Sequence, residues 1–294
     1  MNDRPAPGTA GGSATPPARR AAVLGHPIAH SLSPALHRAA YLHLGLPWSY
    51  DAVDCRPEEL AQVLRRDDPT WAGWSLTMPL KESVLPLLDA VDPLAASVRA
   101  VNTVVPSEGR LLGHNTDVPG LVEVVRALGA DGAGTATLLG AGATARSAVA
   151  ALAASGVADV VAYVRRDAAG EDLRAVAASL GVSLSVRGWG DAVQGLSADL
   201  VISTVPAGAT DELAQQVRPG ASALRGLPGA LVDVVYSPWP TALAAAWDHA
   251  GGAVAGGLEL LVHQAVGQVR LMTGRLVPAA VLRDAGLAEL ERRG

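Results

Sequence analysis

The sequence predicts an α/β protein made of two domains with a cleft between them. Its 294 residues exceed the length of a typical single core, so we expect two cores rather than one. Short apolar runs of strand length alternate with longer helical segments, which is the pattern of a mostly parallel sheet with helices on its faces. With 49% hydrophobic and 17% charged residues, the chain is expected to be globular.

The first half of the chain begins with a segment that we do not expect to fold. Residues 1–20 are mainly Pro, Gly, Ala, Ser and Thr, have little to bury, and are predicted to form a disordered tail. The apolar run 21–24 ends at Gly25 and predicts a buried first strand. Beyond it we expect helices at 34–44, 57–66 and 80–90, strands at 49–53 and 74–77, and a helix that begins at Asp117.

The second half of the chain alternates more regularly. A strand at 135–139 is followed by a helix at 144–154, a strand at 159–164 and a helix at 170–180. Further strands are expected near 182–186, 199–203 and 230–235, and two helices, 257–273 and 278–292, close the chain.

Composition and charge exclude several classes of function. The net charge of −5, without a basic block, argues against nucleic acid and anionic membranes as partners. No apolar run approaches the roughly 20 residues that span a bilayer. Cys55 is the only cysteine, and His26, His30 and His37 lack the spacing of metal ligands, so we expect neither a disulfide nor a metal. A cytoplasmic enzyme or binding protein with a small-molecule ligand fits best.

The chain contains a single lysine, Lys81, although lysine and arginine together number 23. Apart from Asn2, the asparagines are Asn102 and Asn115, and phenylalanine is absent, so a coding bias removes such residues wherever it can. Arginine cannot replace a lysine that must give and take a proton. Lys81 and Asp117 are therefore candidates for a proton-transfer pair. The alternatives are a solvated surface lysine and an aspartate that caps its helix.

A glycine-rich turn follows the strand at 135–139 and opens the next helix. The run Gly140-Ala141-Gly142-Ala143-Thr144-Ala145 has the form G-x-G-x-x-A. Its glycines permit a tight turn and close approach to a pyrophosphate, which would lie at the helix N-terminus. Glycines also mark ordinary turns, but the strand–turn–helix context predicts a Rossmann-like dinucleotide site.

The end of the next strand suggests which dinucleotide binds. Arg165 and Arg166 stand where NAD sites usually place an acidic residue, and arginine accommodates a 2′-phosphate. They favour NADP over NAD, although the next residue, Asp167, is of the acidic type that NAD sites use. The alternative is a solvated loop that carries charges of both signs.

Two hydroxyls follow the first strand. Ser31 and Ser33 are two residues apart, and in an extended segment such side chains point the same way and can grip a polar ligand together. The alternative role of Ser33 is to cap the helix that Pro34 begins.

Seven motifs together resemble the shikimate dehydrogenase family. They run in the family's order from Gly25 to Gly274, so the resemblance covers nearly everything but the tail. In this chain they read G-H-P-I-x-H-S-L-S-P, T-M-P-L-K, A-V-N-T-V, G-H-N-T-D, L-G-A-G-A-T-A-R, Y-S-P-W-P-T and G-G-L-E-L-L-V-H-Q-A.

The resemblance implies an NADP-dependent oxidoreductase that reversibly reduces 3-dehydroshikimate to shikimate on the route to aromatic amino acids. It also implies a substrate-binding domain at 21–116, completed by 257–294, and an NADP-binding domain at 117–256. Such an enzyme is expected to be a cytoplasmic monomer or homodimer.

The resemblance further implies roles for individual residues. Lys81 and Asp117 match the catalytic pair, and Ser31 and Ser33 match the serines that hold the substrate carboxylate. The remaining matches are Asn102, Thr77, Tyr236 and Gln264 as substrate contacts, Gly140, Ala141, Gly142 and Ala143 as the phosphate loop, Arg165 and Arg166 at the 2′-phosphate, and Gly257 near the nicotinamide.

Some positions depart from the family pattern. Ser75 and Val164 stand where asparagine is usual, and Glu259 replaces a methionine near the nicotinamide. A quinate/shikimate dehydrogenase with relaxed substrate or NAD preference is therefore an alternative. A non-catalytic ligand sensor on the same fold is a second, which loss of Lys81 or Asp117 would have favoured.

Overall fold

The computed structural model describes residues 18–64, 68–217 and 229–293. Residues 1–17 of the predicted disordered tail lie outside these ranges. Arg20, the last residue assigned to that tail, instead begins the first strand. Among the described residues, no helix is both long and apolar enough to cross a membrane.

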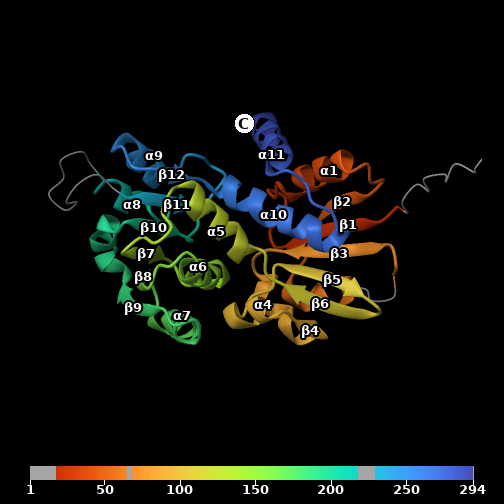
Figure 1. Cartoon of the computed structure of the whole chain (residues 1–294), viewed down its shortest axis with the longest axis horizontal. Coiled ribbons are helices and arrows are strands. Elements are labelled where there is room, and N and C mark those ends of the chain that lie inside the picture. Colours follow the sequence, from red (N-terminus) through yellow and green to blue (C-terminus); the bar gives the residue numbers. More distant parts are fainter. Residues whose placement is uncertain (1–17, 65–67, 218–228, 294) are drawn as a thin grey trace, which may run out of the picture.

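The predicted α/β class is confirmed, because two six-stranded sheets lie side by side with helices packed around them (Figure 1). The sheet nearer the N-terminus has the order β2-β1-β3-β5-β6-β4. It is mixed rather than parallel throughout, since β5 is antiparallel to both β3 and β6. Its strands are β1 (Arg20–Gly25), β2 (Ser49–Asp54), β3 (Trp71–Leu76), β4 (Ala90–Val91), β5 (Thr103–Ser107) and β6 (Arg110–His114).

The second sheet has the order β12-β11-β10-β7-β8-β9, and its paired strands are parallel. The strand order reverses between β7 and β10, and open α/β sheets bind ligands at the carboxyl ends of strands beside such a point. Its strands are β7 (Ala136–Leu139), β8 (Asp159–Val164), β9 (Ser183–Gly188), β10 (Leu200–Ser203), β11 (Ala230–Asp233) and β12 (Val254–Ala255).

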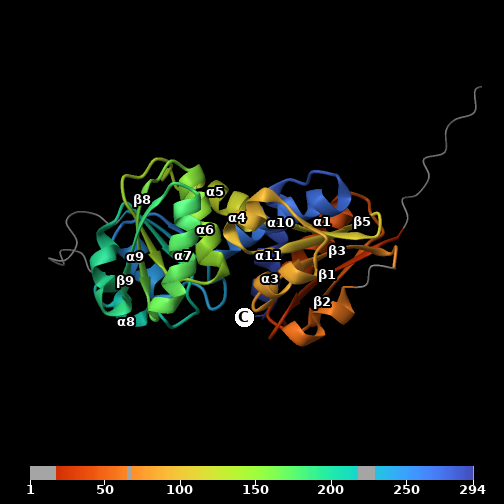
Figure 2. The ribbon, with the colours of Figure 1, turned by 90° about the horizontal axis from the view of Figure 1, so that it is seen from below.

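Long helices connect the two sheets. Helix α10 (Gly257–Thr273) contacts both α5 (Asp117–Ala127) and α1 (Ser33–His43), and α11 (Ala279–Arg293) packs against α1. Figure 2 shows α5, α6 (Ala143–Ala154) and α7 (Asp167–Ser179) beside the second sheet, with α4 (Pro93–Val98) between the two halves. The last two helices therefore return to the side of the first sheet. The limits of the two domains stay a prediction.

Alanine brings α6 close to the second sheet. The helix sequence ATARSAVAALAA buries a continuous run, residues 145–152, in which all side chains but Arg146 and Leu152 are small. Ala148 and Leu152 join a core with Leu138 and Ile202 of the strands. Small side chains allow close packing of helix on sheet. The N-terminus of α6 is therefore held rigidly at the carboxyl end of β7.

Two expectations for the first half need correction. The helix expected at 80–90 is α3 (Leu80–Ser83), followed by a short 3-10 turn, η2 (Leu85–Leu87), and then β4. Pro86 lies within η2, and proline inside a helix removes a backbone donor and clashes with the preceding turn. Over the described residues, the helix expected at 57–66 is η1 (Pro57–Glu59) and α2 (Leu60–Val63), which ends before Leu64; residues 65 and 66 lie outside the described ranges.

The hairpin of β5 and β6 was not expected. Its turn contains Glu108 and Gly109, both with positive φ, as a two-residue hairpin loop of type I′ requires. Further described elements that lacked a clear pattern are α4, η3 (Trp189–Ser197), α8 (Asp211–Ala214) and α9 (Ala242–His249).

Candidate active site

The β5–β6 hairpin brings the two asparagine-containing motifs together. Thr103 at the start of β5 pairs with His114 at the end of β6, and the Asn102 amide donates to the His114 carbonyl at 3.0 Å. The segment before β5 therefore lies beside the segment that enters α5. Asn102 and Asp117 meet at one edge of the first sheet.

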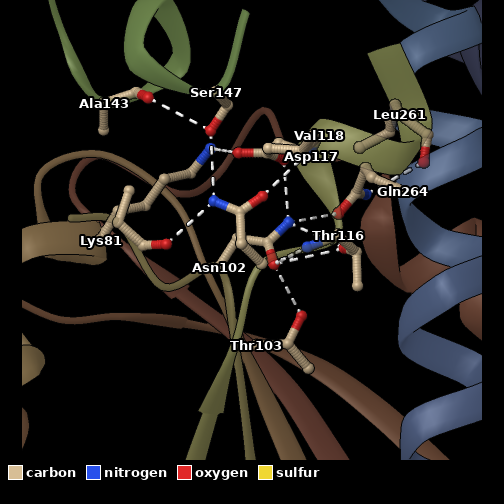
Figure 3. A network of polar contacts seen from close by, with 12 residues as sticks. Lys81, Asn102, Thr103, Thr116, Asp117, Val118, Ala143, Ser147, Leu261 and Gln264 are labelled. Atoms are coloured by element: carbon tan, nitrogen blue, oxygen red, sulfur yellow. Dashed lines mark hydrogen bonds and ion pairs between the residues drawn. The ribbon is translucent and has the colours of Figure 1, made fainter. Parts of the chain in front are cut away.

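Asn102 is the centre of a buried polar network (Figure 3). Its Nδ2 donates to Asp117 Oδ1 at 2.8 Å and to Thr116 Oγ1 at 2.9 Å. Its Oδ1 accepts from the Thr116 amide at 2.9 Å and from Thr103 Oγ1 at 2.8 Å. The residue is 1% exposed, so these bonds form away from water, where an unmade one would be costly. The network fixes the carboxylate of Asp117.

Helix α10 closes the network from the other side. Gln264 Oε1 lies 3.3 Å from Asn102 Nδ2 and its own Nε2 donates to the Leu261 carbonyl. One turn further along, Gln268 Nε2 donates to the Asn102 carbonyl and to Thr103 Oγ1, each at 3.1 Å. Gln268 was not singled out from the sequence, because its partners are some 165 residues away along the chain.

Lys81 and Asp117 form an ion pair in this setting. Lys81 Nζ donates to Asp117 Oδ2 at 2.5 Å, and the two side chains are 14% and 6% exposed. Because Asn102 holds the other carboxylate oxygen, the ammonium has a defined direction. The Lys81 carbonyl also accepts from the Val101 amide at 2.8 Å, which ties α3 to the hairpin. The alternative of a solvated surface lysine is therefore excluded, because both side chains of the pair are largely buried.

The pair faces a cavity of about 280 Å³ that extends from the first sheet to the start of α6. Three residues of the segment His30–Ser33, here called the serine loop, belong to its lining: His30, Ser31 and Ser33. Thr144 in the first turn of α6 and Gly257 at the start of α10 belong to it too. Of the residues predicted from the sequence, the cavity brings together Ser31, Ser33, Thr77, Lys81, Asp117, Tyr236, Gly257 and Gln264. Asn102 is buried one layer behind this lining.

Ser33 is the first residue of α1 rather than its cap. The N-cap position is Leu32, whose side chain makes no capping bond, and Pro34 occupies the first turn. The Ser33 amide donates to Ser31 Oγ at 3.2 Å, which couples the two serines. Capping therefore does not account for the Ser33 hydroxyl, which lines the cavity.

A stack of buried rings supports Ser33 and Ser75 of the cavity wall. His37 Nδ1 lies 2.9 Å from the Ser33 carbonyl, and its ring stacks on Tyr50 with centroids 3.9 Å apart. Burial lowers the pKa of His37 to about 4, so the ring is neutral at pH 7 and Nδ1 carries the donated hydrogen. The Tyr50 hydroxyl donates to Ser75 Oγ at 2.6 Å. Ser75, a departure from the family pattern, is thus held in the cavity wall.

The loop after β11 presents Tyr236. Asp233, at the end of β11, accepts from Thr241 Oγ1 at 2.8 Å and from the Val235 amide at 3.2 Å. Burial raises the pKa of Asp233, and these two bonds stabilise the charged form. Because Val235 precedes Tyr236 and Thr241 follows it, the two bonds hold the chain on either side of Tyr236. A Cβ on Gly257 would meet the Val234 carbonyl at 2.1 Å, so only glycine permits α10 to begin so near this loop.

The turn between β7 and α6 fits the pyrophosphate of a dinucleotide. Gly140 has φ +111°, and a Cβ there would meet Thr204 Oγ1 at 2.6 Å, so both the conformation and the space require glycine. Gly142 is the N-cap of α6 and no side chain caps the helix. A Cβ on Gly142 would meet nothing within 4 Å, so the space beside this residue at the start of α6 is open. A helix N-terminus of this kind favours an anion.

Arg165 and Arg166 follow β8 and are exposed. Within the described part of the chain, neither guanidinium has a hydrogen bond or an ion pair. Arg166 is the N-cap of α7, and Asp167 lies in its first turn. Two unpaired guanidinium groups beside the glycine turn are chemically suited to a phosphate. Across the described ranges, no group of three or more His, Cys, Asp or Glu side chains is arranged to hold a metal ion.

Arg146 joins the two halves of the molecule and was missed from the sequence. It lies on α6 and is 3% exposed. Its Nε donates to the Val98 carbonyl at 2.9 Å and its Nη2 to the Arg99 carbonyl at 3.1 Å, and it pairs with Glu82 at 2.8 Å. Glu82 follows Lys81, so α6 is attached to the helix that carries the lysine. An arginine on the buried face of an alanine-rich helix is the only local signal.

Residues 23–104 match the family described as the shikimate dehydrogenase substrate binding domain, and residues 257–285 match the shikimate 5′-dehydrogenase C-terminal domain. The chain is 37% identical to the shikimate dehydrogenase (NADP(+)) of Moorella thermoacetica over 89% of this chain and 90% of that one. The shikimate dehydrogenase of Mycobacterium tuberculosis has a similar structure, with a TM-score of 0.81, 37% identity, and coverage of 92% of this chain and 99% of that one.

A second similar structure is the shikimate 5-dehydrogenase of Thermus thermophilus in complex with NADP(H) and shikimate. Its TM-score is 0.77 at 36% identity, with coverage of 92% of this chain and 99% of that one. Because nearly all of each chain is covered, the likeness includes both sheets and the helices between them.

Replacing Arg146 by methionine should destabilise the fold. The change leaves the Val98 and Arg99 carbonyls without their donor, which costs about 1–3 kcal/mol in the free energy of unfolding. Urea unfolding followed by far-UV circular dichroism measures the loss. Arg126→Met is the matched control, because within the described ranges the Arg126 side chain has only an exposed pair with Glu123, so this variant should lose less than about 1 kcal/mol. Equal losses in the two variants would contradict the role given to Arg146.

Proposed function

The chain belongs to the shikimate dehydrogenase family, and we propose that it catalyses the reversible NADP-dependent reduction of 3-dehydroshikimate to shikimate. One observation carries this proposal. The Lys81–Asp117 pair lines the same cavity as the Ser31 and Ser33 hydroxyls and as Thr144 in the first turn of α6. A substrate held by the serines in this cavity is proposed to place its reacting carbon between the pair and the dinucleotide turn.

Reduction of the ketone requires a proton on its oxygen, and Lys81 is the proposed donor. Its ammonium can hydrogen-bond the ketone oxygen, stabilise the developing alkoxide and transfer the proton. Asp117 holds the ammonium in place, since its Oδ2 accepts from Lys81 while Asn102 occupies Oδ1. NADPH, when bound, supplies the hydride that reduces the ketone carbon. In the reverse direction Lys81 accepts the proton of the substrate hydroxyl.

The serine loop is the proposed site of the substrate carboxylate. Ser31 and Ser33 both line the cavity and each can donate a hydroxyl hydrogen to a carboxylate oxygen. Thr77, Tyr236 and Gln264 line the same cavity and are proposed to contact the ring hydroxyls. We assign Asn102 first to holding Asp117, because its amide is buried against that carboxylate. Its predicted contact with a ring hydroxyl stays a prediction.

The proposed NADP site extends from the glycine turn to the end of β8. Gly140, Ala141, Gly142 and Ala143 would hold the pyrophosphate, and Arg165 and Arg166 the 2′-phosphate. Gly257 would lie beside the nicotinamide, which agrees with its place in the cavity lining. A cytoplasmic location, a monomeric or homodimeric state and a role on the route to aromatic amino acids complete the proposal.

Initial rates at 340 nm with shikimate or quinate, each with NADP⁺ or NAD⁺, test this function. We expect a high kcat/KM for shikimate with NADP⁺ and much lower values in the other three combinations. Preference for quinate or NAD⁺ would keep the Lys81–Asp117 chemistry and overturn the substrate or cofactor assignment. Absence of turnover in all four would favour the ligand-sensor alternative.

Lys81→Ala should lower kcat by about 10²-fold or more while the circular dichroism spectrum is unchanged, because the proton donor is lost and the fold is not. Lys81→Arg should remain impaired, since a guanidinium stays protonated at the working pH. Turnover near that of the wild type in Lys81→Ala would rule out the role of this lysine.

Arg165→Ala should raise the KM for NADP⁺ on the order of tenfold and leave the KM for NAD⁺ unchanged, because a charge-assisted bond to the 2′-phosphate is lost. Arg187→Ala is the control, as Arg187 lies on the neighbouring strand β9 and is hydrogen-bonded to Gln194. If both variants bind NADP⁺ as the wild type does, Arg165 belongs to a solvated loop.

A further inference from the structure

The C-terminal end of α11, marked C in Figure 2, contacts the serine loop. Arg293 Nη1 donates to the His30 carbonyl at 2.8 Å, and Nη2 donates to the Ser31 carbonyl at 3.1 Å. His30 and Ser31 both line the cavity. A residue 262 positions away in sequence therefore supports the loop assigned to the substrate carboxylate.

These two bonds restrict Ser31 on both sides. The His30 carbonyl belongs to the peptide plane before Ser31, and the Ser31 carbonyl belongs to the plane after it. Since the two planes define φ and ψ of Ser31, one rigid guanidinium that holds both carbonyls fixes the direction of the Cα–Cβ bond of the serine. The Ser31 amide donates to the Ile28 carbonyl at 3.0 Å, which fixes the loop from its other side.

Arg293 is itself held in place. Its Nε donates to Glu289 Oε1 at 2.7 Å, one helical turn earlier, and Glu289 is 17% exposed. Arg292 also binds Glu289, with Nε at 2.8 Å from Oε2 and Nη2 at 2.6 Å from Oε1. In the described part of the chain, Arg292 makes no hydrogen bond to the serine loop. The two neighbouring arginines thus share an anchor but differ in their contact with the loop.

The contact between Arg293 and the serine loop also has an electrostatic effect. Among the described residues that line the cavity, Lys81 is the only lysine or arginine, and it belongs to the reacting centre. Ser31 and Ser33 are neutral. Arg292 and Arg293 together carry one more positive charge than their shared partner Glu289, and Arg293 places its guanidinium on the carbonyl side of the serine loop, where it would stabilise a carboxylate held by the serines.

We infer that Arg293 is a positioning residue for the substrate carboxylate: it orients Ser31 through the His30 and Ser31 carbonyls and adds a positive charge behind the serine loop. This inference rests on the proposed function. It predicts that Arg293 acts on the affinity for the carboxylate-bearing substrate, and neither on turnover nor on the affinity for NADP⁺.

Steady-state kinetics of Arg293→Ala, Arg293→Lys and Arg292→Ala test the inference. Arg293→Ala should raise the KM for shikimate about tenfold, because two charge-assisted bonds are lost, while kcat and the KM for NADP⁺ stay near those of the wild type. Arg293→Lys should recover part of the loss, since it keeps the charge but cannot hold two carbonyls as a fork. Arg292→Ala should behave as the wild type.

Kinetics with shikimate methyl ester distinguish a role toward the substrate carboxylate from a purely structural role of Arg293. Esterification removes the negative charge, so the ratio of KM values between Arg293→Ala and wild type should be smaller for the ester than for the acid. Equal ratios, an equal rise in the KM for NADP⁺, or an equal effect of Arg292→Ala would overturn the inference and leave the proposed function intact. A wild-type enzyme that does not turn over shikimate would instead contradict the proposed function itself.

Discussion

The ion pair between Lys81 and Asp117 is the interaction on which the rest of the site depends. Its two charges are largely removed from water, which is costly unless every polar atom around them is satisfied. Asn102 meets this requirement for the carboxylate, and the β5–β6 hairpin exists in the register that brings Asn102 beside Asp117. Helix α10 closes the network through Gln264 and Gln268. The first sheet and the last long helix are therefore both arranged around one oriented ammonium group.

Much of the second sheet could be predicted from the sequence, because its strands are short apolar runs bounded by glycine and polar residues. The strand β8 and the helix α10 have the bounds that the pattern indicated. The first half was harder for physical reasons. Pro86 interrupts a segment that is otherwise helical in pattern, and the hairpin depends on pairing between strands that carry no strong alternation. Such pairing is decided by contacts between segments that local propensity does not record.

The candidate site could be predicted as far as residue chemistry is visible locally. The rarity of lysine singled out Lys81, and the glycine turn singled out the start of α6. Arg146 and Arg293 could not be found this way, since their partners lie 48 and 263 residues away. Glu259, a departure from the family pattern, is half-buried and pairs with Arg283 on α11 at 2.6 Å. Its charge is thus satisfied between the two closing helices rather than in the cavity.

The central claim is that Lys81 and Asp117 act as one unit, and a double-mutant cycle on kcat tests it most directly. The rate of shikimate oxidation would be measured for Lys81→Ala, Asp117→Ala and the double variant. Residues that act as a unit show strongly non-additive losses. We predict that the double variant is no slower than the slower single variant. A loss in the double variant equal to the product of the two single losses would contradict this account.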